Sequence, residues 1–348
     1  MAATEFDRLI PLTERGPASA AELQCDLAPL QQPVILRQQF ADWPLVKAAR
    51  ESEQALAGYI CEFAPRQAVK AFAGGKEIEG RYFYSEDFRG LNFDRIELTL
   101  TQLFERLHDI AARGSGESVY AGAIPLKAEL EALLAANCNP LLDPSIEQLS
   151  SLWIGNQGVT ATHYDLPQNV AGVVCGRRRF TLFPPEQLDN LYLGPLDITL
   201  AGQPVSMVDL EDPDLTRFPK FAAALDTAVT GVLDPGDGIY IPSMWFHHVR
   251  SLDDLGVLMN FWWRDAAPHM FTPMFTMLHA MLSVKGLPEY EKQCWKRMFE
   301  QYVFEENGDP MAHLPEHARG FFGDLDAEKV ARLRLYLLHS LGGQPRQS

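Results

Sequence analysis

The spacing of hydrophobic and polar residues changes twice along the chain and divides it into three regions. Residues 1–115 mix short extended and helical patterns, among them an apolar run at 34–36 and a helical stripe over 98–112. Residues 116–265 contain many short apolar runs bounded by turn-forming residues, as is typical of β-strands. From residue 266 onward, apolar residues recur every three or four positions, which predicts helices. We therefore expect an N-terminal α/β extension packed on the core at 1–115, a β-strand core at 116–265 and a C-terminal helical region at 266–348.

Two turn signals lie inside the β-rich region. Gly176-Arg177 separates two apolar runs and predicts a hairpin. The sequence Asp-Pro-Gly-Asp-Gly at 234–238 predicts a second turn, which leads into the apolar run 239–241. Many short strands joined by such turns are typical of a sandwich, a barrel or a jelly roll. The predicted fold class is therefore mainly β with flanking helices.

The composition limits the partners that this chain is expected to have. Its 348 residues carry a formal net charge of −16, and an acidic surface repels phosphate groups, so nucleic acid is not the expected partner. We expect no membrane span, because no uninterrupted apolar run of about 18 residues occurs, and the N-terminus lacks a signal pattern. The five cysteines are scattered without a C-x-x-C pair, which favours free thiols in the cytoplasm.

One constellation of residues indicates metal chemistry. His163 and Asp165 are two residues apart, so both side chains lie on the same face of an extended strand. Together with a distant histidine they form the two-histidine, one-carboxylate set that holds non-haem Fe(II) and leaves three positions open. The sequence offers His247 and His248, which face opposite sides of a strand. The face of His247 also carries core-compatible Val249, so we expect His163, Asp165 and His247 to bind the metal and to carry catalysis.

Several ordered motifs resemble the JmjC/cupin-8 family and, within it, the asparaginyl hydroxylases that act on hypoxia-inducible factor. The motifs occupy 163–169, 176–185, 234–242, 245–248 and 260–262. The similarity runs from about residue 33 to 265 and is dense from about 150. The resemblance implies a double-stranded β-helix core, or jelly roll, that holds Fe(II), uses 2-oxoglutarate as co-substrate and consumes O2.

The resemblance also implies roles for further residues. The positions that match the family's 2-oxoglutarate pocket are Tyr120, Thr160, Asn169, Arg178 and Asn260. The family usually has a lysine where this chain has Arg178, and an arginine can also bind a carboxylate, through two parallel hydrogen bonds. Trp262 matches an aromatic residue beside the iron and the substrate, although a buried core tryptophan fits the same position.

These inferences favour an Fe(II)- and 2-oxoglutarate-dependent dioxygenase that hydroxylates a protein or peptide side chain. Asp165 favours hydroxylation, since related halogenases lack this carboxylate. The alternatives are a non-enzymatic cupin that binds a metal or a carboxylate, a cupin that uses another metal, and a hydroxylase of a small metabolite or a tRNA nucleoside.

The C-terminal helices are expected either to cover the core or to form a homodimer. The carboxylates at 209–214 are expected in a solvated loop, and recognition of a basic substrate is the alternative role for them.

Overall fold

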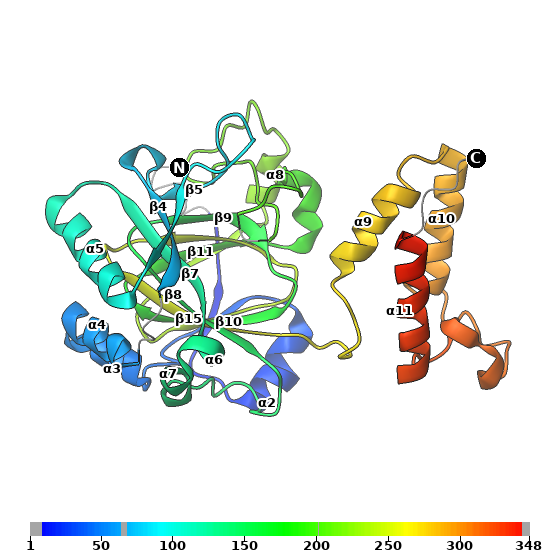
Figure 1. Ribbon diagram of the computed structural model, residues 1–348, viewed down its shortest axis with the longest axis horizontal. Coiled ribbons are helices and arrows are strands. Elements are labelled where there is room, and N and C mark those ends of the chain that lie inside the picture. The colour runs from blue at the N-terminus through cyan, green and yellow to red at the C-terminus, as the bar shows by residue number, and fades with distance from the viewer. Residues whose placement is uncertain (1–8, 64–67, 201, 343–348) are drawn as a thin grey trace. The chain divides into compact units, whose positions relative to one another are not determined.

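The computed structural model describes residues 9–63, 68–200 and 202–342. The chain divides into two compact units, and the boundary lies between Arg264 and Asp265 (Figure 1). All strands of the described residues lie in the first unit, and the described part of the second unit is helical.

The first unit is built on two β-sheets. The six-stranded sheet contains, in spatial order, β1 (Ile10–Pro11), β12 (Val229–Leu233), β11 (Arg178–Phe183), β14 (Phe246–Ser251), β9 (Val159–Tyr164) and β5 (Arg81–Tyr82). The nine-stranded sheet contains β2 (Thr13–Arg15), β3 (Val34–Leu36), β13 (Gly238–Ile241), β10 (Gln168–Cys175), β15 (Gly256–Trp263), β8 (Leu149–Gly155), β7 (Ser118–Pro125), β4 (Val69–Gly74) and β6 (Asp94–Leu98). Apolar side chains of both sheets meet in one buried cluster, which includes Val173 and Phe180. This is the mainly β, jelly-roll class that the sequence predicted.

Both predicted turns are present, and each requires a glycine. Gly176 joins β10 to β11 with a φ of 69°, and a Cβ atom there would lie 2.3 Å from the carbonyl oxygen of Leu255. Gly236 lies in the turn before β13 with a φ of 98°. The buried carboxylate of Asp237 stabilises that turn by accepting hydrogen bonds from the backbone N–H groups of Gln38 and Asp234.

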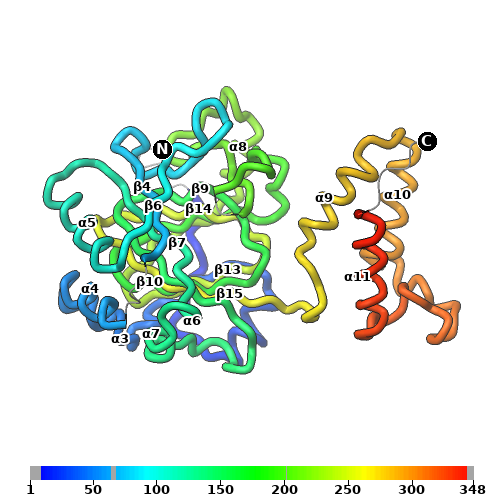
Figure 2. Tube along the Cα trace, in the orientation of Figure 1, coloured from blue at the N-terminus to red at the C-terminus, as the bar shows by residue number. Residues whose placement is uncertain are grey.

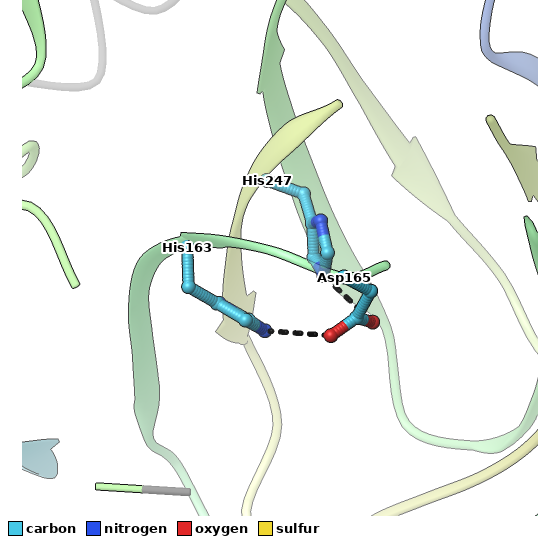
Figure 3. Close-up of side chains that lie close together, drawn as sticks. All are labelled: His163, Asp165 and His247. Atoms are coloured by element: carbon cyan, nitrogen blue, oxygen red, sulfur yellow. Dashed lines mark ion pairs between the residues drawn. The ribbon is translucent and has the colours of Figure 1, made fainter. Parts of the chain in front are cut away.

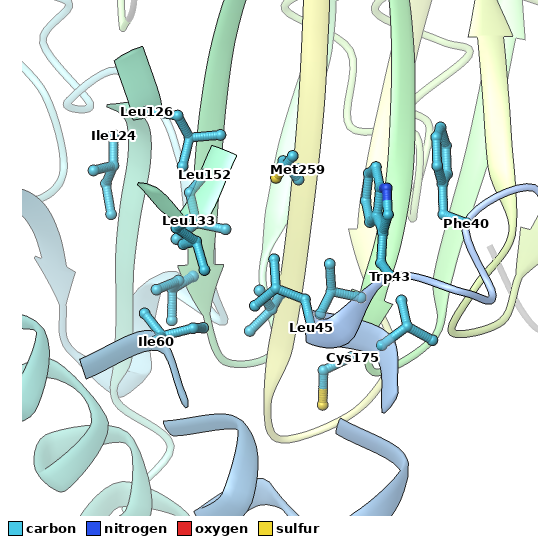
Figure 4. Packing of buried hydrophobic residues seen from close by; sticks show 14 of the residues in the cluster. Phe40, Trp43, Leu45, Ile60, Ile124, Leu126, Leu133, Leu152, Cys175 and Met259 are labelled. Carbon is cyan, nitrogen blue, oxygen red and sulfur yellow. The ribbon is translucent and has the colours of Figure 1, made fainter. Parts of the chain in front are cut away.

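Helices cover the outer side of the nine-stranded sheet (Figure 1). The helices of the first unit are α2 (Ala20–Glu22), α3 (Pro44–Glu51), α4 (Glu53–Glu62), α5 (Leu100–Arg113), α6 (Leu126–Glu129), α7 (Glu131–Ala136) and α8 (Phe221–Leu225). The longest, α5, begins with a capping box between Thr99 and Gln102 and buries one apolar stripe. Its apolar residues join the largest buried cluster, where Leu45 and Trp43 lie close to Met259 of β15 (Figure 4).

The long segment between β11 and β12 folds back over the six-stranded sheet. Its residues Leu191, Val208 and Phe221 are buried in a cluster with Tyr164 of β9 and Phe246 of β14. This cluster lies on the side of the sheet that faces away from the other sheet. The segment therefore supports the strands β9 and β14 from behind.

The second unit consists of helices, as the periodicity beyond residue 265 predicted. They are α9 (Pro273–Ser283), α10 (Glu289–Tyr302) and α11 (Ala327–Gly342), and Figure 2 shows the path of the chain through them. None of these three helices contains a buried residue among the residues described. No helix in the described part of the chain is both long and apolar enough to cross a membrane.

Candidate metal centre

Two neighbouring strands bring three metal-binding side chains together. His163 lies on β9 and His247 on β14, and the antiparallel pairing sets these two residues directly opposite each other. Asp165 follows immediately after β9, so its side chain returns to the face of His163. Figure 3 shows both imidazole rings directed toward the carboxylate. The candidate ligand atoms of the three residues all lie within 4.8 Å of one another.

The distances fit one divalent ion. Nε2 of His163 lies 3.9 Å from Oδ1 of Asp165, and Nε2 of His247 lies 3.6 Å from Oδ2. Ligand atoms about 2.1 Å from an ion lie roughly 3 Å apart when they occupy adjacent octahedral positions. A closure of less than about 1 Å in each of these two histidine–aspartate pairs would therefore bring them to that spacing, and side-chain rotation can supply it.

Hydrogen bonds orient both imidazole rings for metal binding. Nδ1 of His163 donates to the carbonyl oxygen of Ala161 at 2.9 Å, and Nδ1 of His247 donates to that of Trp245 at 3.1 Å. Each ring therefore directs the lone pair of Nε2 toward Asp165. Burial, together with the nearby His163 ring, lowers the pKa of His247 to about 4. Two imidazoles and one carboxylate suit a first-row divalent cation with open coordination positions.

His248 does not belong to this set. It is 2% exposed and faces the opposite side of the sheet, where its Nε2 lies 3.3 Å from Oε1 of Glu211. Its Nδ1 lies 3.5 Å from the hydroxyl oxygen of Thr162. The structure therefore directs His247 toward His163 and His248 away from it.

A cavity opens beside the three ligands, between the two sheets. All nine residues singled out in the sequence line it: His163, Asp165, His247, Tyr120, Thr160, Asn169, Arg178, Asn260 and Trp262. Between the polar groups the lining is apolar and includes Phe180, Val249 and Leu258.

Thr160 reaches this cavity through an irregularity in β9. It lies three residues before His163, so regular alternation would direct the two side chains to opposite faces. The pairing of β9 with β14 shifts between His247 and Val249, which are opposite His163 and Thr160 respectively. The additional residue on β9 forms a β-bulge, which returns Thr160 to the face of His163.

Arg178 places a buried cation in the cavity. The side chain is 4% exposed, and its Nε has no hydrogen-bond partner. Burial lowers the pKa of the guanidinium, while the nearby Tyr120 opposes that shift. Among the described residues that line the cavity, Asp165 is the only carboxylate. A Cβ atom on Gly256 would lie 3.3 Å from Nη2 of Arg178, so the missing side chain of this glycine leaves room for the guanidinium.

The sequence analysis did not identify Trp153 as a site residue. Its indole Nε1 donates to Oδ1 of Asn260 at 2.6 Å, and Nδ2 of Asn260 donates to Oδ1 of Asn169 at 3.1 Å. Trp153 therefore fixes the orientation of two predicted co-substrate residues. The local sequence predicts a strand over 152–155, but it gives no signal for this contact with another strand.

Glu211 was also missed, and the expectation of a solvated loop is wrong for this residue. Nη2 of Arg179 donates to its two carboxylate oxygens at 2.6 and 2.8 Å, and Arg250 lies 3.4 Å away. Burial acts to raise the pKa of Glu211, but hydrogen bonds from His248 and Arg179 outweigh burial and hold this pKa at about 2. Glu211 thus ties the segment between β11 and β12 to the two strands β11 and β14.

Comparison with known proteins gives a family match over most of the chain. A family model described as "Cupin-like domain" matches residues 20–269. The chain is 37% identical over 122 residues to "Lysine-specific demethylase JMJ31" of Arabidopsis thaliana, which covers 34% of this chain and 22% of that protein. It is 42% identical over 118 residues to "HSPB1-associated protein 1" of Homo sapiens, covering 33% and 23%. It is 36% identical over 103 residues to "tRNA wybutosine-synthesizing protein 5" of Danio rerio, covering 30% and 28%. The aligned parts thus span only about a quarter of these relatives.

Proposed function

Because the chain belongs to the cupin-like family of JmjC-type domains, we propose that it is an Fe(II)- and 2-oxoglutarate-dependent oxygenase. The proposed reaction is hydroxylation of a protein or peptide side chain. The observation that carries this proposal is the convergence of His163, Asp165 and His247 beside a cavity that contains the buried cation of Arg178.

The metal ligands would occupy one face of the ion and leave the remaining positions to small molecules. When bound, Fe(II) with 2-oxoglutarate would supply the activation of O2 that hydroxylation requires. His163 and His247 offer imidazole nitrogen donors, and Asp165 offers a carboxylate oxygen.

Arg178 supports the co-substrate assignment because a buried guanidinium without an anionic partner is costly. The distal carboxylate of 2-oxoglutarate would supply that partner, through paired hydrogen bonds to the guanidinium. Tyr120 and Thr160 lie beside Arg178 and offer hydroxyl groups to the same carboxylate. Asn169 and Asn260 would contribute polar contacts along the wall of the cavity.

Two observations bear on the substrate. The names of the relatives indicate action on lysine in one case and on tRNA in another. The net charge of −16 disfavours a polyanion, so we place a protein or peptide side chain ahead of tRNA. A small metabolite is the third substrate class to be screened.

Turnover of 2-oxoglutarate tests the proposal. Anaerobic protein with Fe(II) and 2-oxoglutarate should develop a weak visible absorption band, and O2 should then yield succinate. His163→Ala and Asp165→Ala should abolish succinate formation, whereas His108→Ala, which removes an exposed histidine, should not. Metal binding without succinate would favour a non-enzymatic cupin, and succinate from Asp165→Ala would refute the ligand assignment.

The helices of the second unit support a further part of the proposal, a homodimer formed through this region. Apolar side chains on α9 and α11 are exposed within the chain, with Leu282 85%, Leu338 69% and Leu335 67% exposed. Side chains of this kind are buried at the centres of homodimer interfaces.

We also propose a cytoplasmic location, because the five cysteines are free thiols in the structure. The division into an extension (1–115), a core (116–265) and a dimerisation region (266–348) belongs to the same proposal.

A further inference from the structure

We propose that Trp262 is a positioning residue that holds the Asp165 carboxylate as a one-oxygen metal ligand. The inference rests on the proposed metal site and deepens it. Its starting point is the hydrogen bond from the indole Nε1 of Trp262 to Oδ2 of Asp165, at 3.0 Å. The family resemblance had placed Trp262 beside the iron and the substrate, but only as an aromatic ring.

The hydrogen bond crosses from one sheet to the other. Trp262 lies on β15 of the nine-stranded sheet, whereas Asp165 follows β9 of the six-stranded sheet. The backbone N–H of Met244 donates to the carbonyl oxygen of Asp165 at 2.9 Å, which fixes its main chain. That contact does not restrain rotation of the carboxylate, so the indole provides a restraint that the backbone lacks.

Such a restraint matters because Asp165 lies outside the β-ladder and its side chain is 20% exposed. A free carboxylate can turn toward solvent, or it can bind a metal ion through both oxygens. Two-oxygen binding would occupy a coordination position that the co-substrate and O2 need. A donor on Oδ2 uses one lone-pair direction of that oxygen and leaves Oδ1, on the side of His163, for the ion.

The indole of Trp262 is itself held in place. Its ring meets that of Trp153 edge to face, with centroids 5.8 Å apart and an interplanar angle of 81°. Trp153 is in turn fixed by its hydrogen bond to Asn260. One connected set of contacts therefore runs from the wall of the co-substrate cavity to the metal carboxylate.

Binding of Co(II) tests this role without turnover. Trp262→Phe removes the N–H donor and keeps an aromatic ring, and Trp262→His keeps an N–H donor on a smaller ring. Trp263→Phe is the matched control, because Trp263 is the next residue on the same strand and stacks on Tyr240, away from the cavity. Co(II) affinity is measured by competition with a chelator, and coordination is measured by the intensity of the visible d–d bands. Thermal unfolding of the metal-free protein reports on the fold.

We expect Trp262→Phe to weaken Co(II) binding by about 10- to 100-fold, the usual effect of losing a hydrogen bond to a metal ligand. Its d–d bands should also change, because a mobile carboxylate alters the coordination number. Trp262→His should recover part of the affinity, and Trp263→Phe should bind like the wild type. If Trp262→Phe does not fold, Trp262→Leu, which also lacks a hydrogen-bond donor, replaces it in the same comparison.

If Trp262→Phe binds Co(II) with wild-type affinity and shows wild-type d–d bands, the inference is overturned and the proposed function stays intact. An equal loss in Trp263→Phe would overturn it too, because the effect would then belong to any tryptophan on the strand. Absence of Co(II) binding by the wild type would instead overturn the metal site, and this inference with it.

Discussion

Replacing Arg178 by methionine should stabilise the metal-free protein while it removes binding of the co-substrate. The guanidinium is 4% exposed, and its Nε has no partner. The effective penalty for burying one ion is several kcal/mol, here taken as about 3 kcal/mol. The substitution also removes the interaction with Tyr120, which is worth about 1 kcal/mol. The net expected gain is about 2 kcal/mol in the free energy of unfolding.

The same substitution should weaken 2-oxoglutarate binding. Removing one partner of a buried charge pair costs about 2–5 kcal/mol, which corresponds to roughly a 30- to 4,000-fold increase in the dissociation constant. The gain in stability should raise the melting temperature by about 4–8 °C, since 1 kcal/mol corresponds to about 2–4 °C for a unit of this size. Stability and binding are therefore expected to change in opposite directions.

Thermal unfolding of the metal-free protein measures the first effect, and calorimetric titration of Mn(II)-loaded protein with 2-oxoglutarate measures the second. Arg179→Met is the matched control, because the adjacent Arg179 is paired with Glu211 and is 16% exposed. Loss of that pair should lower stability by about 2 kcal/mol and leave binding of 2-oxoglutarate largely unchanged. An Arg178→Met protein that is less stable than the wild type, or that binds 2-oxoglutarate equally well, would refute the reasoning.

Three further outcomes are expected. Because the pKa of Glu211 is lowered from 4.5 to about 2, its stabilisation is present above pH 4.5 and is lost as the pH falls toward 2. Glu211→Gln should flatten this acid limb of the pH–stability curve, and an unchanged limb would contradict the role of its ion pair. Gly256→Ala should displace the guanidinium of Arg178 and weaken binding of 2-oxoglutarate by about 1 kcal/mol, which raises its KM roughly fivefold and leaves kcat nearly unchanged. An unaltered KM would exclude this packing effect. Leu338→Arg should convert a dimer into monomers in light scattering, and a wild-type monomer would refute the proposed interface.

The residue pattern within a single strand was sufficient to predict those parts of the site that depend on one strand. Alternation placed His163 and Asp165 on a common face, and the neighbours of His247 distinguished it from His248. The same pattern did not predict the position of Thr160, because the β-bulge in β9 directs its side chain to the face opposite to the expected one. A bulge depends on the partner strand, and the residues of β9 alone do not indicate it.

The remaining contacts join segments that are far apart in the sequence. Trp153 and Asn260 are 107 residues apart, and Glu211 reaches His248 across 37 residues. Hydrophobic spacing predicts that such residues lie on strands or in loops, but it does not specify which distant side chain each will meet. For the same reason the periodicity beyond residue 265 predicted helices without indicating what would cover their apolar faces.

The main-chain pairing of two strands sets His163 opposite His247, and this pairing does not itself involve a metal ligand. A set of donors arranged in this way offers the same nitrogen and oxygen atoms to manganese, iron, cobalt or nickel. Intrinsic affinity rises along that series, so affinity alone does not select iron. The identity of the resident ion would then depend on which metals the cell keeps available while the chain folds.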